Sequence, residues 1–225
     1  MRVVVLTCDL YLWAMRPFAY LFNTYWSSLQ EVVVGCYTFP KWDLPDNYNL
    51  ISLGKDPGGG NWSDGLIKLL EQLPDELIVF MLEDYWLTRT ADTQGIRSLG
   101  DWMRAHPEVL RVDLTTDRLY NGQMVDSNIH WGHYDLVETP FESPYQMSFQ
   151  AGIWRRESLL SLLQPGKSPW EVEMYTQPSQ TMRVLGTRQW PLRYLNALKS
   201  GNEGEVLNLE ELESHHREVI SQWLP

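Results

Sequence analysis

Short apolar runs rich in β-branched residues, with helical patterns between them, are the feature that most constrains the fold of this 225-residue chain. Residues 2–7 (RVVVLT), 31–38 (EVVVGCYT) and 75–84 (DELIVFMLED) lack the apolar–polar alternation of a strand with one solvated face. They therefore predict strands buried on both faces. Helical spacing in residues 14–29 and 62–73 separates them. This alternation predicts an α/β domain with a mainly parallel central sheet.

The second half of the chain has less regular patterns. We expect a strand at residues 147–156, a helix at 156–166 and a strand that runs into a short helix at 187–198. Residues 208–224 predict a terminal amphipathic helix. No internal repeat interrupts this order, so the whole chain fits one domain.

The composition excludes some classes of function. The formal net charge of −11 argues against a protein that is held to nucleic acid or anionic membrane by a general basic surface. A local basic groove remains compatible with it. Two cysteines, Cys8 and Cys36, do not suggest a disulfide framework, and neither a signal peptide nor a membrane-spanning run is recognisable. We expect a cytoplasmic protein.

An acidic pair ends the apolar run at residues 77–82. Glu83 and Asp84 follow it directly, and Thr7 and Asp9 follow the first strand in the same way. Because the carboxyl ends of parallel strands share one edge of the sheet, these residues are expected to lie together where ligands bind. Carboxylate oxygens suit Mg²⁺ or Mn²⁺. On pattern alone, a solvated strand end explains the pair equally well.

Other candidates also have two interpretations. Glu171 and Glu173, in PWEVE at 169–173, fit either a base that acts on a hydroxyl group or the start of a helix, where glutamate is favoured. His215 and His216 suggest metal ligands or surface residues. Because they are adjacent on a predicted helix, at most one of them is a plausible ligand.

Three segments, taken in order, resemble a known family. They are residues 6–26 (LTCDLYLWAMRPFAYLFNTYW), 80–88 (FMLEDYWLT) and the stretch from 148–163 (SFQAGIWRRESLLSLL) to PWEVE. They resemble a bacterial and viral family of small glycosyltransferase-like proteins with the GT-A nucleotide-sugar fold. The resemblance implies a Rossmann-like mixed central sheet flanked by helices, in a single domain of residues 1–225. Residues 1–115 would bind the nucleotide sugar, and residues 116–225 would form the acceptor side and the C-terminal helix.

The resemblance also implies roles for individual residues. The implied nucleoside contacts are Thr7, Asp9 and Tyr11. The implied ligands of ribose and of Mn²⁺ or Mg²⁺ are Glu83 and Asp84, with His215 or His216 completing the metal shell. The implied acceptor side contains Gln150, Trp154 and Trp170, and the base would be Glu171 or Glu173. If the metal site is incomplete, the arginines that would supplement the diphosphate charge are Arg118, Arg155, Arg156 and Arg183; a surface role is the alternative for each. Where many members have a further Asp, this chain has Tyr85, which makes metal dependence a prediction to test.

The predicted activity is therefore transfer of a sugar from a nucleotide-diphosphate sugar, such as a UDP-sugar, to an acceptor hydroxyl group. A single base implies inversion at the anomeric carbon. The acceptor would be a glycan or a hydroxymethylated base in phage DNA. A nucleotidyltransferase is a second class, although it would carry a Gly-rich, Arg- or Lys-bearing loop where this chain has CDLYLWAMR at 8–16. A non-catalytic sugar- or nucleotide-binding module is a third.

Overall fold

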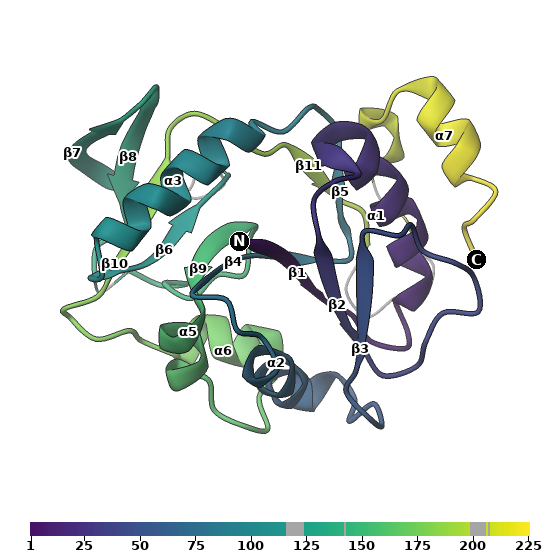
Figure 1. Cartoon of the computed structure of the whole chain (residues 1–225). Helices are drawn as coiled ribbons and strands as arrows, with labels where there is room; N and C mark the ends of the chain where they lie inside the picture. The colour runs from purple at the N-terminus through teal and green to yellow at the C-terminus, as the bar shows by residue number, and fades with distance from the viewer. Residues whose placement is uncertain (116–123, 142, 199–205, 207) are drawn as a thin grey trace.

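The computed structural model describes the chain except for residues 116–123, 142, 199–205 and 207 (Figure 1). Its strands, in chain order, are β1 (Arg2–Leu6), β2 (Val32–Cys36), β3 (Tyr48–Ser52), β4 (Leu77–Leu82), β5 (Tyr85–Leu87), β6 (Val109–Asp113), β7 (Val125–Trp131), β8 (Tyr134–Glu138), β9 (Gly152–Arg155), β10 (Arg183–Thr187) and β11 (Tyr194–Asn196). Its α-helices are α1 (Met15–Phe22), α2 (Trp62–Glu71), α3 (Thr93–Ala105), α5 (Arg156–Leu162), α6 (Pro169–Tyr175) and α7 (Ser214–Ile220). Short turns of other helix types are η1 (Leu12–Ala14), η2 (Asn23–Ser27), η3 (Gly59–Asn61) and η4 (Leu209–Glu211).

One large mixed sheet takes strands from both halves of the chain. Nine strands follow the order β3-β2-β1-β4-β9-β6-β10-β8-β7, and β11 and β5 form a separate two-stranded ladder. Strands β3, β2, β1 and β4 are parallel neighbours, whereas β9 runs antiparallel between β4 and β6. Beyond β6, β10 is parallel to it, and β8 and β7 pair antiparallel. The predicted α/β fold, a mixed central sheet flanked by helices, is confirmed.

Both faces of the sheet centre are covered, which explains the continuous apolar runs. Val3 and Val5 of β1 belong to a core cluster with the apolar faces of α1 and α3, and Val4 and Leu6 belong to a second cluster with α2 and α5. Figure 1 shows α1 and α3 on one side of the sheet and α2, α5 and α6 on the other. A fully buried side chain of this size contributes about 1.5–3 kcal/mol relative to an exposed one. Period-two patterning is absent because neither face is solvated.

The structure corrects four expectations about elements. The sheet is mixed and not mainly parallel: β3, β2, β1 and β4 form one parallel block and β6 and β10 another, whereas β9, β8 and β7 pair antiparallel with their neighbours. The strand expected at 147–156 covers only Gly152–Arg155. The short helix expected at the end of 187–198 is the strand β11, whose backbone pairs with β5. The terminal helix is limited to α7, with the short turn η4 before it.

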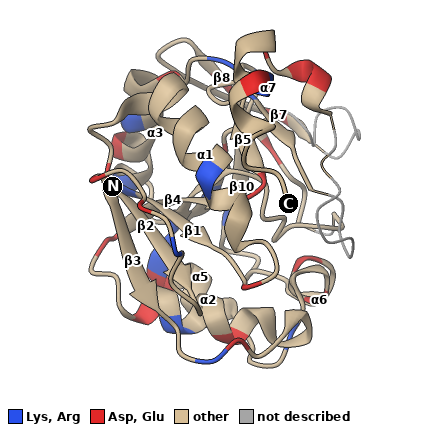
Figure 2. Ribbon diagram, turned by 90° about the vertical axis from the view of Figure 1, so that its right-hand side faces the viewer, with Lys and Arg blue, Asp and Glu red and all other residues tan. Residues whose placement is uncertain are grey.

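Charged residues lie mostly around the sheet, on helices and loops (Figure 2). Strands β2 and β4 contain no charged residue, as their burial favours, whereas β6 carries the buried pair Arg111 and Asp113. Within the described residues, no helix has both the length and the apolar stretch that crossing a bilayer requires.

Candidate active site at the carboxyl ends of the central strands

The register between β1 and β4 brings two predicted site residues to one edge of the sheet. Leu6 is paired with Leu82 in the parallel ladder, so Thr7 and Glu83, which follow them, leave the sheet side by side. The end of β2 lies next to β1, where Gly35 pairs with Leu6. The acidic pair therefore lies at the carboxyl ends of the central strands, where open α/β sheets bind their ligands.

A cavity of about 580 Å³ opens at this edge. Its size lies within the range of small-molecule and cofactor sites. Five of the predicted site residues line it: Thr7, Tyr11, Glu83, Asp84 and Trp170. Trp170 comes from the N-terminus of α6, in the second half of the chain. The structure therefore unites two of the three predicted nucleoside contacts and the acidic pair with one residue that was expected on the acceptor side.

Asp9 has a different position from the one expected. Both of its carboxylate oxygens accept hydrogen bonds from Thr38, one from the main-chain nitrogen (2.9 Å) and one from the hydroxyl group (3.0 Å). Its own main-chain nitrogen donates to Asp56 Oδ2 (3.0 Å). Asp9 thus braces the loops behind the cavity and is not part of the cavity wall.

The acidic pair is electrostatically uncompensated by other described side chains. Burial raises the pKa of Glu83 well above its ordinary value, and the charge of Asp84 raises it further. Burial also raises the pKa of Asp84, to about 6, although the backbone amides of Asp84 and Leu198 oppose this shift. Among the described residues that line the cavity, the charged ones are Asp56, Glu83 and Asp84, and none is Lys, Arg or His.

These two carboxylates fit a divalent cation. A cation between them would favour the ionised forms that burial disfavours. Mg²⁺ is commonly held by one or two carboxylates together with waters and substrate phosphates, so a third protein ligand is not required. Glu83 and Asp84 supply that donor set.

The histidines do not join the acidic pair. The described residues contain no group of three or more His, Cys, Asp or Glu side chains placed to hold a metal ion. His216 is buried, its Nδ1 lies 2.8 Å from the Tyr20 hydroxyl group, and its ring packs on Tyr20 and Tyr25. His215 is exposed beside Glu213. The predicted metal set of Glu83, Asp84 and a histidine is therefore not assembled, because α7 docks on α1 through aromatic contacts.

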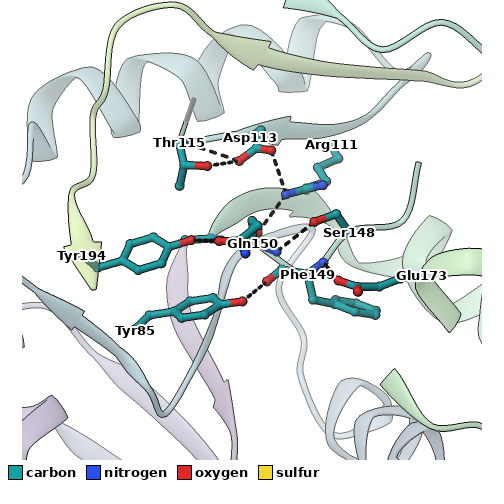
Figure 3. Close-up of polar contacts among 10 residues, drawn as sticks. Tyr85, Arg111, Asp113, Thr115, Ser148, Phe149, Gln150, Glu173 and Tyr194 are labelled. Carbon is teal, nitrogen blue, oxygen red and sulfur yellow. Dashed lines mark hydrogen bonds and ion pairs between the residues drawn. The ribbon is translucent and has the colours of Figure 1, made fainter. Parts of the chain in front are cut away.

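Tyr85, at the position where many members of the resembled family have a further Asp, is a core residue. Its side chain is buried, stacks on Tyr194 with ring centroids 4.4 Å apart, and donates a hydrogen bond to Phe149 O (3.2 Å). It is not among the residues that line the cavity. Tyr85 therefore fastens the loop at 147–151, and Glu83 and Asp84 are the carboxylates at this strand end (Figure 3).

The two predicted bases have separate roles in the structure. Glu171 accepts hydrogen bonds from the main-chain nitrogen (2.9 Å) and hydroxyl group (2.8 Å) of Ser168, in a capping box that begins α6. These bonds lower the pKa of Glu171. Glu173 Oε1 accepts a hydrogen bond from the main-chain nitrogen of Phe149 (2.6 Å), as Figure 3 shows. For Glu171, the alternative interpretation as a helix-start residue is the correct one.

A buried arginine holds the loop that carries Gln150. Arg111 and Asp113 are fully buried, with Nη2 and Oδ2 3.2 Å apart, and Arg111 Nη2 also donates to Gln150 O (2.8 Å). The Arg111 guanidinium lies 4.9 Å from the centre of the Trp154 ring. Trp154 is itself fully buried, so it offers no surface to an acceptor. That prediction is corrected: a tryptophan in the central strand β9 packs in the core.

The predicted diphosphate arginines are engaged elsewhere. Arg155 donates to Met103 O, and Arg156 donates to Asp75 O. Both oxygens precede a strand, β6 and β4 respectively, so they lie toward the amino ends of the strands and away from the cavity. Arg183 forms a two-pronged ion pair with Glu138, with both distances 2.8 Å. None of the three lines the cavity, and Arg118 lies outside the described residues.

The sequence did not predict several residues that line the cavity, among them Asp56, Tyr37 and Trp62. Asp56 Oδ1 accepts a hydrogen bond from the main-chain nitrogen of Gly58 (2.8 Å), which has the positive φ of 81° that glycine tolerates. The signal for this turn is the Asp-Pro-Gly stretch itself. Tyr37 and Trp62 complete an aromatic wall, but nothing in their local sequence distinguishes them from core aromatics.

Comparisons with known proteins give similarity of structure only. No protein-family model and no curated protein sequence matches the chain. Residues 1–349 of TarS from S. aureus, in complex with UDP-GlcNAc, match with 14% identity and a TM-score of 0.49, over 90% of this chain and 60% of that one. A CMP:2-keto-3-deoxy-manno-octonic acid synthetase complexed with CTP matches with 13% identity and a TM-score of 0.43, over 99% of both chains.

A third match is glucosyl-3-phosphoglycerate synthase from Mycobacterium tuberculosis, in complex with Mn²⁺, UDP and glucosyl-3-phosphoglycerate. Its identity is 15% and its TM-score 0.42, over 76% of this chain and 62% of that one. The chain thus spans about 60% of the length of the TarS fragment. With TM-scores of 0.42–0.49, these matches support no conclusion about the activity of this chain.

Proposed function

We propose that this protein transfers a glycosyl group from a nucleotide-diphosphate sugar to an acceptor hydroxyl group. One observation carries the proposal. A single cavity at the carboxyl ends of β1, β2 and β4 combines an aromatic wall with a carboxylate pair, Glu83 buried and Asp84 half-buried, that has no cationic partner among the described lining residues. The resemblance of residues 6–26 and 80–88 to the glycosyltransferase-like family points in the same direction.

The aromatic part of the cavity suits a nucleoside. Tyr11, Tyr37, Trp62 and Trp170 line it from four different segments of the chain. Flat aromatic side chains stack on bases and on sugar rings, and their polar edges satisfy hydroxyl groups. The buried Thr7 adds a hydroxyl group at the end of β1.

The acidic part of the cavity suits a diphosphate only together with a cation. Two phosphate groups beside Asp56, Glu83 and Asp84 would otherwise bring like charges together in a poorly solvated space. We assign Glu83 and Asp84 to hold Mn²⁺ or Mg²⁺. When bound, this cation neutralises the charge that develops on the departing diphosphate.

Of the two predicted bases, we assign the role to Glu173. The carboxylate of Glu171 is committed to the start of its own helix. Glu173 is not among the residues that line the cavity, but it lies beside the loop at 147–151, next to Phe149 and close enough to Tyr85 for its charge to raise the pKa of that phenol. A base on the face opposite the leaving group would remove the proton of the acceptor hydroxyl as that oxygen attacks the anomeric carbon, with inversion.

Nucleotidyl transfer is the second candidate. It needs cationic groups against a triphosphate, and the segment after β1 offers Arg16 for that purpose. The guanidinium of Arg16 instead lies 4.8 Å from the centre of the Trp223 ring, and Arg16 is not among the residues that line the cavity. This position favours glycosyl transfer.

The test is incubation of the full chain with a panel of nucleotide-diphosphate sugars, with Mn²⁺ and with EDTA, while nucleoside diphosphate is measured. We expect binding of at least one donor, with Mn²⁺-dependent release of nucleoside diphosphate that Asp84→Asn abolishes. The anomeric configuration of the product then tests inversion. Absence of binding and of release with every donor would refute the proposal, and release of pyrophosphate from nucleoside triphosphates would support the second candidate.

A further inference from the structure

A second cavity, of about 470 Å³, is lined by residues of β11 and of the segments that flank the β5–β11 ladder. Asn196 of β11 lines it and is paired with Tyr85, the residue that follows Asp84. The main-chain nitrogen of Ala197 donates to Asp84 O (2.8 Å), which fastens this ladder to the acidic pair. Asn196, which lines the second cavity, thus lies opposite the residue that follows Asp84 of the first cavity.

The charge of this second cavity is opposite to that of the first. Arg89 and Arg193 line it, and both are exposed. The main-chain nitrogen of Thr88 donates to Arg193 O (3.0 Å), so the two arginines extend from adjacent points of the ladder. Within the described part of the chain, neither guanidinium has an ion-pair partner, and one acidic residue, Glu211, lines the cavity. Two arginines that no described carboxylate pairs with are unexpected in a chain of net charge −11.

The side chains beside the arginines form a site that is already oriented. The Arg193 guanidinium lies 4.2 Å from the centre of the Trp190 ring, which limits its freedom. The Gln150 Oε1 atom accepts a hydrogen bond from the Tyr194 hydroxyl group, which directs the amide nitrogen of Gln150 away from that bond (Figure 3). Asn196 adds a further amide donor.

We propose that this cavity binds the acceptor and that the acceptor carries a phosphate group. This inference rests on the proposed function, which assigns the first cavity to the donor. The planar guanidinium fork matches phosphate oxygens in pairs. The two arginines and the amides of Gln150 and Asn196 together offer more hydrogen-bond donors than the two oxygens of a carboxylate can accept from. A phosphate group presents three or more acceptor oxygens and can use more of these donors. A phosphate held here would leave an acceptor hydroxyl group within reach of the first cavity, across the ladder.

The test measures binding of small phosphate compounds to the full chain by isothermal titration calorimetry, without any nucleotide sugar. The probes are glycerol phosphate (a monoester), diglycerol phosphate (a diester), glycerate and glycerol. We expect both phosphate probes to bind in a salt-dependent manner, glycerate to bind at least about tenfold more weakly, and glycerol not to bind. Tighter binding of the monoester would indicate an acceptor with a terminal phosphate, and tighter binding of the diester would indicate a phosphate within a polymer backbone.

Two variants and a control locate the binding. Arg89→Gln and Arg193→Gln are each expected to weaken phosphate binding about tenfold or more, whereas Arg→Lys at either position restores part of it. Lys41→Gln removes an exposed cation outside both cavities and is expected to change nothing. Equal binding of glycerate and glycerol phosphate, or unchanged phosphate binding in both arginine variants, would overturn the inference.

A kinetic measurement separates this inference from the proposed function. With a donor that binds, the arginine variants are expected to keep donor affinity and acceptor-independent release of nucleoside diphosphate, but to lose stimulation by the phosphate probe. If no donor binds while phosphate binding follows the arginines, the proposed function fails and the acceptor role fails with it. If donors bind but the arginine variants behave like wild type toward phosphate, this inference alone fails.

Discussion

Removing the charge of Asp84 is expected to stabilise the protein while it abolishes activity. The pKa of this carboxyl group rises from 3.8 to about 6 on folding, because burial disfavours the ionised form. At about 1.36 kcal/mol for each unit of pKa, this rise corresponds to at most about 3 kcal/mol. The asparagine in Asp84→Asn has nearly the same shape, and its side-chain oxygen can still accept from the backbone amides of residues 84 and 198, but it carries no charge to desolvate.

The sign of the pH dependence follows from linkage. Because the pKa is higher in the folded state, the folded protein binds the proton more tightly, so stability decreases as pH rises. The loss begins near the unfolded value of 3.8 and is complete above about 6. Asp84→Asn should therefore equal wild type near pH 4 and exceed it by up to about 3 kcal/mol at neutral pH, which is a gain of roughly 6–12 °C in Tm.

The assay is urea unfolding of both proteins in EDTA at several pH values, with the difference in free energy of unfolding plotted against pH. The difference cancels the titration of the shared groups that Asp84 does not influence; Glu83 is the exception, because the charge of Asp84 raises its pKa. Asp46→Asn, at an exposed position before β3, is the matched control and should give no such curve. A variant that is less stable than wild type at neutral pH, or a difference that does not change with pH, would refute the reasoning.

A divalent cation should reverse this difference. Mn²⁺ that binds only the folded state stabilises it by mass action, and it also favours the ionised carboxylates. We expect Mn²⁺ to raise the Tm of wild type and to leave that of Asp84→Asn nearly unchanged. Equal shifts in the two proteins would place the cation elsewhere.

Three further predictions concern the surroundings of the cavity. Glu173→Gln should lower kcat about 100-fold or more without unfolding the protein. Glu171→Gln preserves the capping box and should keep wild-type activity. Equal activity of the two variants would exclude the PWEVE segment from the chemistry. A Cβ atom on Gly65 would overlap the hydroxyl group of Tyr37, so Gly65→Ala should weaken donor binding in calorimetry, and the double variant with Tyr37→Phe should recover it. Asp113→Ala leaves a buried guanidinium without its carboxylate and should cost about 3–5 kcal/mol in urea unfolding, a loss that an exposed position would not show.

The position of the acidic pair could be predicted from local sequence. A continuous apolar run that ends in Glu83 and Asp84 identifies both a buried strand and its carboxyl end. The same argument placed Thr7 at that edge, and the parallel register of β1 and β4 confirms it. These predictions were possible because strand burial and strand direction follow from consecutive residues.

Roles that depend on distant partners were not predictable in this way. The sequence predicted that Trp154 and Arg183 would belong to the site. The structure instead buries Trp154 against Arg111 and pairs Arg183 with Glu138. Glu171 and Glu173 are two residues apart, yet one caps its own helix and the other holds Phe149. Sequence spacing cannot reveal which of two equivalent carboxylates finds a tertiary partner.

Short stretches of sequence were enough to establish the α/β class, the buried central strands and the edge of the sheet that carries the acids, because burial and period are properties of short segments. What faces those acids depends on tertiary packing alone. Trp170 and Leu198 reach the first cavity from the second half of the chain, and Arg89 reaches the second cavity from the first half. A cavity is enclosed by segments that long-range packing brings together, and its charge is the sum of side chains that no local pattern connects.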